Sequence, residues 1–319
     1  MPTEKLDFAG QVEQMKSKGI TFKLMNEKQA MEFLRDDTYY FRLKFYAGNY
    51  DKHRDGPKKG KYIDLDFAYL KELSLLDVYF RRAMFPIVID IEHYTKVSLL
   101  NAVNKNKRED GYSIVQDLFT KQKWLKREIL HQKTPYTEGL VNKYGENFGV
   151  WNIVEVLTFT NLISLYDLYF SKYQQKHVET EHLYAVRSIR NSIAHNNCLL
   201  QNLRAGEPPE LEHKQDIYSA VASIPAIGDS MRKNKLAVPV LYDFVATLEV
   251  FDKMVTSQKE RIKQIELLYS LISTRFTRHI DYFDNNPVVS SAIDFMLKVV
   301  SHYRRKALNG ISCEDVNIF

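Results

Sequence analysis

The stretch ETEHLYAVRSIRNSIAHNN, residues 179–197, predicts a helix around which the rest of the chain is organised. Its apolar residues recur three and four positions apart, which is the spacing of one buried helical face. They are Leu183, Val186, Ile189 and Ile193. At about 100° per residue, His195 lies far from this stripe, Asn191 lies beside it, and Arg190 lies on its flank, about 140° from His195. The core side is therefore apolar, and a cation, an amide and an imidazole point away from it.

The side chains of Arg190, Asn191 and His195 suit cleavage of RNA without a metal. An imidazole can move a proton to or from a ribose hydroxyl near neutral pH. A guanidinium keeps its charge and can stabilise a phosphate in the transition state, and the amide can orient the imidazole or hold a phosphate oxygen. Taken alone, an Arg followed five residues later by a His is a weak pattern. The competing interpretation is a solvated helix face with a surface histidine.

Because Arg190 and His195 point in different directions from the helix, the site is expected to need more than one chain. A single helix cannot easily aim both side chains at one phosphate. Two copies of the helix, facing each other across a two-fold axis, would place two Arg and two His in one cleft. This geometry predicts a homodimer with a composite site.

The composition favours an all-α fold. Only 12 Gly and 9 Pro occur among 319 residues, so turns are sparse and long helices are favoured over many short strands. The net charge of +5 permits nucleic-acid binding without requiring it. The two Cys, at 198 and 313, form neither a CxxC motif nor a disulfide framework, so we expect no metal site and no cofactor. We find no signal-peptide or membrane-spanning pattern, and we therefore expect a cytoplasmic protein.

Basic residues accompany aromatic residues in the segment from Tyr39 to Tyr46. Arg42 and Lys44 alternate there with Tyr and Phe, which is compatible with base stacking plus phosphate contact. The alternative is a helix whose aromatic side chains are buried on one face. Both interpretations stay open from the sequence.

Two further basic groups are candidates for contact with RNA backbone. The first could equally be a solvated loop, and its glycine spacing does not match a nucleotide P-loop. A charge cluster like the second is usually a solvated face. The first group, in the loop of residues 51–61, consists of His53, Arg54, Lys58, Lys59 and Lys61. The second, around Trp124, consists of Lys123, Lys126 and Arg127.

Apolar runs on either side of these groups predict long helices. Residues 66–103 should form one or two helices, with Pro86 kinking or breaking the run. Residues 150–173 should form one buried helix that contains Glu155, which either bonds to a neighbouring element or orients His195. For domains, we expect an N-terminal helical and basic-loop region, 1–65, and a helical domain, 66–319, or one continuous domain.

Four segments together resemble the abortive-infection protein family typified by AbiD and AbiF, whose helical core is of the HEPN type. Their order and spacing carry the resemblance more than any one of them. They are Tyr40-Phe41-Arg42-Leu43 with Tyr46, Leu76-Asp77 through Arg82 to Ile91-Glu92, Trp151 through Glu155-Val156-Leu157 to Leu165-Tyr166, and Arg190-Asn191…Ala194-His195.

The resemblance implies an all-helical HEPN bundle with additional N-terminal and C-terminal helices. It also implies a dimeric, metal-independent endoribonuclease of phage defence or of a toxin–antitoxin system, with Arg190 and His195 catalytic and Asn191 accessory. A structured non-coding RNA would be a partner. Cys198 stands where an Arg commonly follows the His in the family. The alternatives are therefore a catalytically silent module that binds RNA, or a helical scaffold with no role in nucleic-acid binding.

Overall fold

The computed structural model describes residues 5–131, 134–175, 178–206 and 215–309. Within these ranges every regular element is a helix, and the only β pairing consists of two isolated bridges, Thr21 with Asp66 and Lys52 with Tyr62. The prediction of an all-α fold is therefore confirmed.

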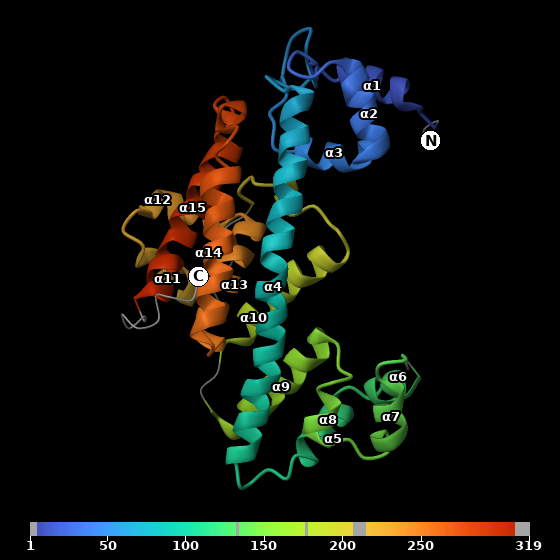
Figure 1. The fold of residues 1–319 in the computed structure, drawn as a ribbon, viewed down its shortest axis with the longest axis vertical. Helices are drawn as coiled ribbons and strands as arrows, with labels where there is room; N and C mark the ends of the chain where they lie inside the picture. Colours follow the sequence, from blue (N-terminus) through green and yellow to red (C-terminus); the bar gives the residue numbers. More distant parts are fainter. Residues whose placement is uncertain (1–4, 132–133, 176–177, 207–214, 310–319) are drawn as a thin grey trace.

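The helices follow one another along the chain as Figure 1 shows. They are α1 (Phe8–Ser17), α2 (Glu27–Asp36), α3 (Tyr40–Ala47), α4 (Phe67–Lys105), α5 (Ser113–Lys121), α6 (Leu125–His131), α7 (Glu138–Tyr144), α8 (Val150–Ile153), α9 (Phe159–Tyr173), α10 (Thr180–Ala194), η1 (Leu199–Gln201), α11 (Gln215–Ala222), α12 (Asp229–Leu236), α13 (Pro239–Met254), α14 (Gln258–Ser270), η3 (Leu271–Arg275), η4 (Ile280–Phe283) and α15 (Pro287–Leu308).

The 39-residue helix α4 spans the length of the molecule (Figure 1). Helices α1–α3 lie at its N-terminal end, and α5–α8 lie near its other end. Pro86 lies inside α4 without ending it, although proline in a helix interior costs about 3 kcal/mol. Met84, Ile87 and Val88 around it are completely buried, and each such side chain contributes about 1.5–3 kcal/mol. Core packing therefore outweighs the local penalty.

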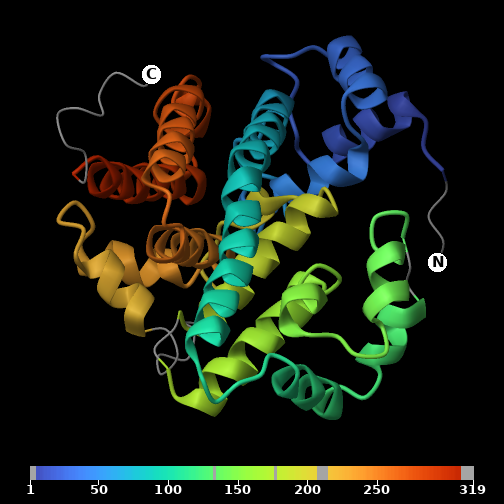
Figure 2. The same cartoon turned by 60° about the horizontal axis from the view of Figure 1, so that its bottom comes forward.

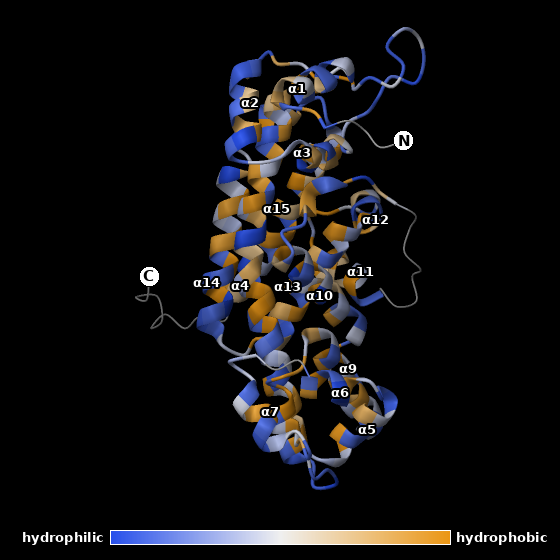
Figure 3. Cartoon of the chain, turned by 90° about the vertical axis from the view of Figure 1, so that its right-hand side faces the viewer, coloured by the Kyte–Doolittle hydropathy of each residue, from blue (hydrophilic) through white to orange (hydrophobic). Residues whose placement is uncertain are grey.

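The predicted signature helix is α10, and it packs against α4, α9 and α13 (Figure 2). Leu183, Val186 and Ile189 of its apolar stripe are buried, and Ile193 packs against the same core while partly exposed. One cluster of buried apolar side chains extends from Val12 to Tyr303. The apolar ribbon segments lie mainly along the inside of the helical bundle (Figure 3). The N-terminal helices thus share a core with the remainder, and a domain boundary at residue 65 stays a prediction.

The prediction of one helix over residues 150–173 was wrong. The chain forms the short α8, then a turn, then α9, which begins after Thr158. The Thr158 hydroxyl accepts the backbone N–H of Asn161 at 3.3 Å, so this side chain caps a new helix. Apolar composition alone did not reveal this local cap.

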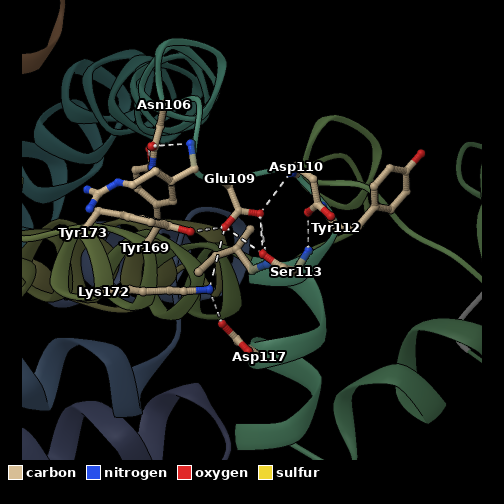
Figure 4. Close-up of polar contacts among 12 residues, drawn as sticks. Asn106, Glu109, Asp110, Tyr112, Ser113, Asp117, Tyr169, Lys172 and Tyr173 are labelled. Atoms are coloured by element: carbon tan, nitrogen blue, oxygen red, sulfur yellow. Dashed lines mark hydrogen bonds and ion pairs between the residues drawn. The ribbon is translucent and has the colours of Figure 1, made fainter.

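A polar cluster around Glu109 joins the segment after α4 to α5 and α9 (Figure 4). The Glu109 side chain is completely buried. Its carboxylate accepts the hydroxyl of Ser113 at 2.8 Å, the hydroxyl of Tyr173 at 2.6 Å and the backbone N–H of Gly111 at 2.9 Å. Lys172 lies 3.8 Å from the same group. Since these donors satisfy the buried carboxylate, the cluster has a structural role.

In the described part of the chain, no helix combines the length and the apolar character that crossing a membrane requires.

Candidate functional site

The signature helix ends in a Schellman motif that places His195 at its C-cap. The backbone N–H of Asn197 donates to the carbonyl of Ser192 at 2.7 Å, and that of Asn196 to the carbonyl of Ile193 at 3.0 Å. Asn196 takes the left-handed conformation that this motif needs, with φ +56°. His195 is exposed, so its imidazole is available to a ligand. Because the helix stops at Ala194, three residues before the predicted end, His195 belongs to the turn.

Two buried arginines contact this turn from the core side. Arg42 of α3 donates to the backbone carbonyl of Asn196 at 2.9 Å, and Arg81 of α4 donates to the Asn196 side-chain oxygen. The completely buried Asp77 accepts Nε of Arg81 at 2.9 Å and lies 3.6 Å from Nη2 of Arg42. Asp77 also accepts the backbone N–H of Leu200 at 2.8 Å. We call Arg42, Asp77, Arg81 and Asn196 the turn network, because together they position the segment that carries His195.

The turn network gives Arg42 a role that differs from the predicted one. Its side chain is only 7% exposed and already bonds to Asn196 and pairs with Asp77. Its guanidinium therefore holds the signature turn and is not presented at the surface for an RNA phosphate. Lys44, one helical turn from Phe41, is exposed.

Arg190 makes its contacts with α4 and with its own neighbour, and not with His195. Its Nε donates to the Glu92 carboxylate at 3.2 Å, and its Nη1 donates to the side-chain oxygen of Asn191 at 3.3 Å. The Arg190 side chain is 32% exposed, and that of Glu92 is 18% exposed. A guanidinium has five N–H donors, so three remain for a ligand, including both at Nη2. The carboxylate and the amide thus orient the cation while leaving part of it open to solvent.

Glu155 lies in the turn between α8 and α9, and its side chain is 57% exposed. Its partner is Lys96 of α4 at 3.4 Å, and exposed pairs of this kind contribute little to stability. Of the two roles that the sequence left open, this contact favours the bond to a neighbouring element over orientation of His195.

The basic loop of residues 51–61 is closed by backbone hydrogen bonds. The N–H of His53 donates to the carbonyl of Lys61 at 2.9 Å, and that of Gly60 to the carbonyl of His53 at 2.8 Å. Arg54, Lys58, Lys59 and Lys61 are exposed, and His53 is half-buried. His53, Lys58 and Lys61 also line a cavity of about 570 Å³. The loop therefore presents its cations on a fixed backbone.

The second basic group lies at the other end of the molecule. Lys123 and Arg127 are exposed near Trp124, while Lys126 donates to the backbone carbonyl of Glu146 at 3.3 Å. Helix α6 in this group and the N-terminal helices beside the basic loop lie at opposite ends of α4 (Figure 1). The structure therefore does not join the two basic groups into one surface.

Cys198 follows the signature turn and lies against the turn network. Burial raises the pKa of its thiol, while the Tyr46 hydroxyl and the Arg42 cation act in the opposite direction. In this chain the thiol at this position is buried. Within the described ranges, no group of three or more His, Cys, Asp or Glu residues is arranged to hold a metal ion.

Sequence reasoning missed four residues of the site: Glu92, Asp77, Arg81 and Asn196. Asp77 and Glu92 were present in the segments that carry the family resemblance, so those segments contained a usable signal. Asn196 follows the predicted helix end, where asparagine is a known substitute for the left-handed glycine. Arg81 gave no separate signal.

The turn network makes a specific prediction for stability. Asn196→Ala should lower the free energy of unfolding by about 2 kcal/mol, roughly half from the lost acceptor of Arg81 and half from the left-handed backbone. Asn196→Gly should lose only the first half, because glycine adopts this conformation freely. Denaturant unfolding of both variants measures the two parts, with Asn196→Asp as the control that keeps an acceptor. Equal losses for Ala and Gly would contradict the role of the backbone conformation.

Comparison with known protein families places this site in a matched region. The model of a family described as Abi-like protein matches residues 32–201, more than half of the chain. The matched range contains α3, α4, α10 and η1, and so all of the turn network together with Arg190 and His195. No curated protein and no solved structure matches.

Proposed function

The chain belongs to the Abi-like protein family, and from that premise we propose that it is a metal-independent HEPN endoribonuclease acting in phage defence by abortive infection or as a toxin. The family relationship itself suggests phage defence. The observation that carries the nuclease activity is the end of α10, where the exposed His195 precedes Asn196, which the buried arginines contact, and Arg190 keeps donors open to a ligand. Asn191 supports Arg190 as an accessory residue.

The proposed reaction uses the ribose of the substrate as the nucleophile. The 2′-hydroxyl oxygen forms a bond to the adjacent phosphorus while the bond from phosphorus to the 5′-oxygen breaks. His195 accepts the proton of the 2′-hydroxyl or donates one to the leaving 5′-oxygen. Arg190 stabilises the extra negative charge on the phosphate through Nη2. The products are a 2′,3′-cyclic phosphate and a 5′-hydroxyl.

We also propose that the active form is a homodimer. One His195 supplies one proton-transfer group, whereas the reaction needs both a base and an acid. A second copy would bring a second His195 and a second Arg190 to the same cleft. Support comes from α4, where Phe85 and Ile89 are 48% and 39% exposed and lie two turns and one turn before Glu92. This apolar face beside Arg190 fits a second copy of the same helix pair.

The cations of the basic loop and Lys44 extend the proposed RNA surface on one side of this site. They belong to the N-terminal end of the molecule, which α3 connects to the signature turn. Lys123, Lys126 and Arg127 lie at the other end, so any contact they make would be with a longer RNA, such as a structured non-coding partner. The alternative function is binding of such an RNA without cleavage.

A cleavage assay tests the proposed function. The protein is purified free of nucleic acid and incubated with end-labelled RNA in the presence of EDTA, and the product ends are identified. We expect 2′,3′-cyclic phosphate ends, and no cleavage of the same sequence with 2′-O-methyl groups, because the methyl group removes the nucleophile. Products with 3′-hydroxyl ends, or cleavage of the methylated RNA, would refute the mechanism. Tight, salt-sensitive binding without cleavage would support the silent RNA-binding module instead.

A further inference from the structure

Helix α3 exposes two phenylalanine side chains with a lysine between them. Phe41 is 60% exposed and Phe45 is 40% exposed. Their ring centroids lie 5.0 Å apart with the ring planes at 81°. Nζ of Lys44 lies 5.6 Å from the centroid of the Phe41 ring. We call Phe41, Lys44 and Phe45 the α3 face. Within one turn of the helix, this face offers two apolar rings and one positive charge to solvent.

The opposite side of α3 fixes this face to the candidate site. Leu43, Tyr46 and Ala47 are buried in the core, and α3 packs against α4 and η1. Arg42 from the same helix bonds to the carbonyl of Asn196, the residue next to His195. The α3 face is therefore held close to the signature turn, on the element that supports that turn.

Further positive charge surrounds Lys44. Lys18 and Lys52 both lie beside Tyr62, because the backbone N–H of Tyr62 donates to the carbonyl of Lys18 at 2.8 Å and Lys52 pairs with Tyr62 in an isolated β bridge. The pKa of Lys18 is lowered, first by burial and then by the charges of Lys44 and Lys52. Nζ of Lys52 also lies 4.5 Å from the centroid of the Tyr62 ring. Lys52 lies near the start of the basic loop, so the positive charge continues from the α3 face toward the cations of residues 53–61. Such a surface complements a polyanion.

We propose that the α3 face, with Lys18 and Lys52, binds unpaired nucleotides of an RNA strand. Bases stack on Phe41 and Phe45, and the backbone phosphates contact the three ammonium groups. In a single strand every base has a π-face that can stack on a ring, and every phosphate carries a charge that can pair with an ammonium group. A paired duplex does not expose its base faces, so the site selects single-stranded segments. The proposal rests on the proposed function only in taking RNA as the ligand.

The test measures binding in a His195→Ala background, so that the RNA stays intact. The probes are a fluorescent 12-nucleotide single strand, the same sequence as a duplex, and an abasic strand of equal length. The double substitution Phe41→Ala with Phe45→Ala should weaken binding of the single strand by roughly thirtyfold or more, because loss of each of the two stacked bases costs about five- to a hundredfold. It should leave the abasic strand nearly unaffected. Lys44→Ala and Lys52→Ala should each lower the slope of log affinity against log salt by about one.

Two control variants separate stacking from loss of fold. Phe41→Tyr with Phe45→Tyr keeps both rings and should keep binding. Tyr136→Ala removes a ring that is 96% exposed elsewhere, and it should bind as the parent does.

The outcomes separate this inference from the proposed function. Equal losses on the single strand and the abasic strand, or no loss on either, would overturn the stacking surface. A change from dimer to monomer in light scattering on loss of both rings would also overturn it, because the face would then contact a second copy. Binding that depends on both rings in a protein that never cleaves RNA would overturn the nuclease and leave the stacking surface standing.

Discussion

His195→Ala is expected to lower the rate of RNA cleavage by about 10²- to 10⁴-fold, the usual contribution of a general acid or base. The imidazole is exposed on a turn that buried charges hold, so its loss removes the proton-transfer group without disturbing the core. Initial rates with labelled RNA and EDTA measure the effect. The matched control is His131→Ala, which removes an exposed histidine from the end of α6 and should cleave at the parent rate.

The same variant also tests the composite site. His195→Ala and Arg190→Ala should each be nearly inactive as homodimers. If the two chains share one cleft, mixing the variants under conditions of subunit exchange should restore part of the activity, because the mixed dimer combines an intact His195 with an intact Arg190. If the dimers exchange subunits but stay inactive, one chain's His195 does not act with the partner's Arg190, and the expected complementation is refuted. Parent-like activity of His195→Ala alone would refute its catalytic role.

Asp77→Ala is expected to lower the free energy of unfolding by about 3–5 kcal/mol, the range for removing one partner of a buried ion pair. The loss would leave the guanidinium groups of Arg42 and Arg81 buried without their carboxylate. Thermal and denaturant unfolding measure the change. Because these arginines hold Asn196, cleavage should also fall at temperatures where the variant remains folded.

The control for the effect of Asp77→Ala on cleavage is another largely buried ion pair, which lies outside the site. Glu72 accepts Nη2 of Arg275 at 3.0 Å, and the Glu72 side chain is 8% exposed. Glu72→Ala should therefore lower stability while leaving the cleavage rate of the folded protein unchanged. If Asp77→Ala and Glu72→Ala affect cleavage equally at matched stability, the turn network does not position the site.

The sequence by itself determined the features that depend on near neighbours. The side chains of Asn26 and Gln29, three residues apart, form a capping box at the start of α2. The stripe Leu183, Val186 and Ile189 is buried as its periodicity requires. Spacings of three or four residues are set by the helix itself, so one segment contains all the information needed. For the same reason, the sequence placed Arg190, Asn191 and His195 away from the core.

The tertiary structure decided what those side chains contact. Arg42 was assigned to RNA from its aromatic surroundings, but it bonds to Asn196, 154 residues away. Glu92 reaches Arg190 across 98 residues, and Glu155 meets Lys96. The two basic groups lie at opposite ends of the molecule. Such partners depend on how α3, α4 and α10 pack together, and packing is fixed by contacts among all helices. Local periodicity therefore identified the helix that carries the candidate site, and only the assembled bundle showed which charges hold it in place.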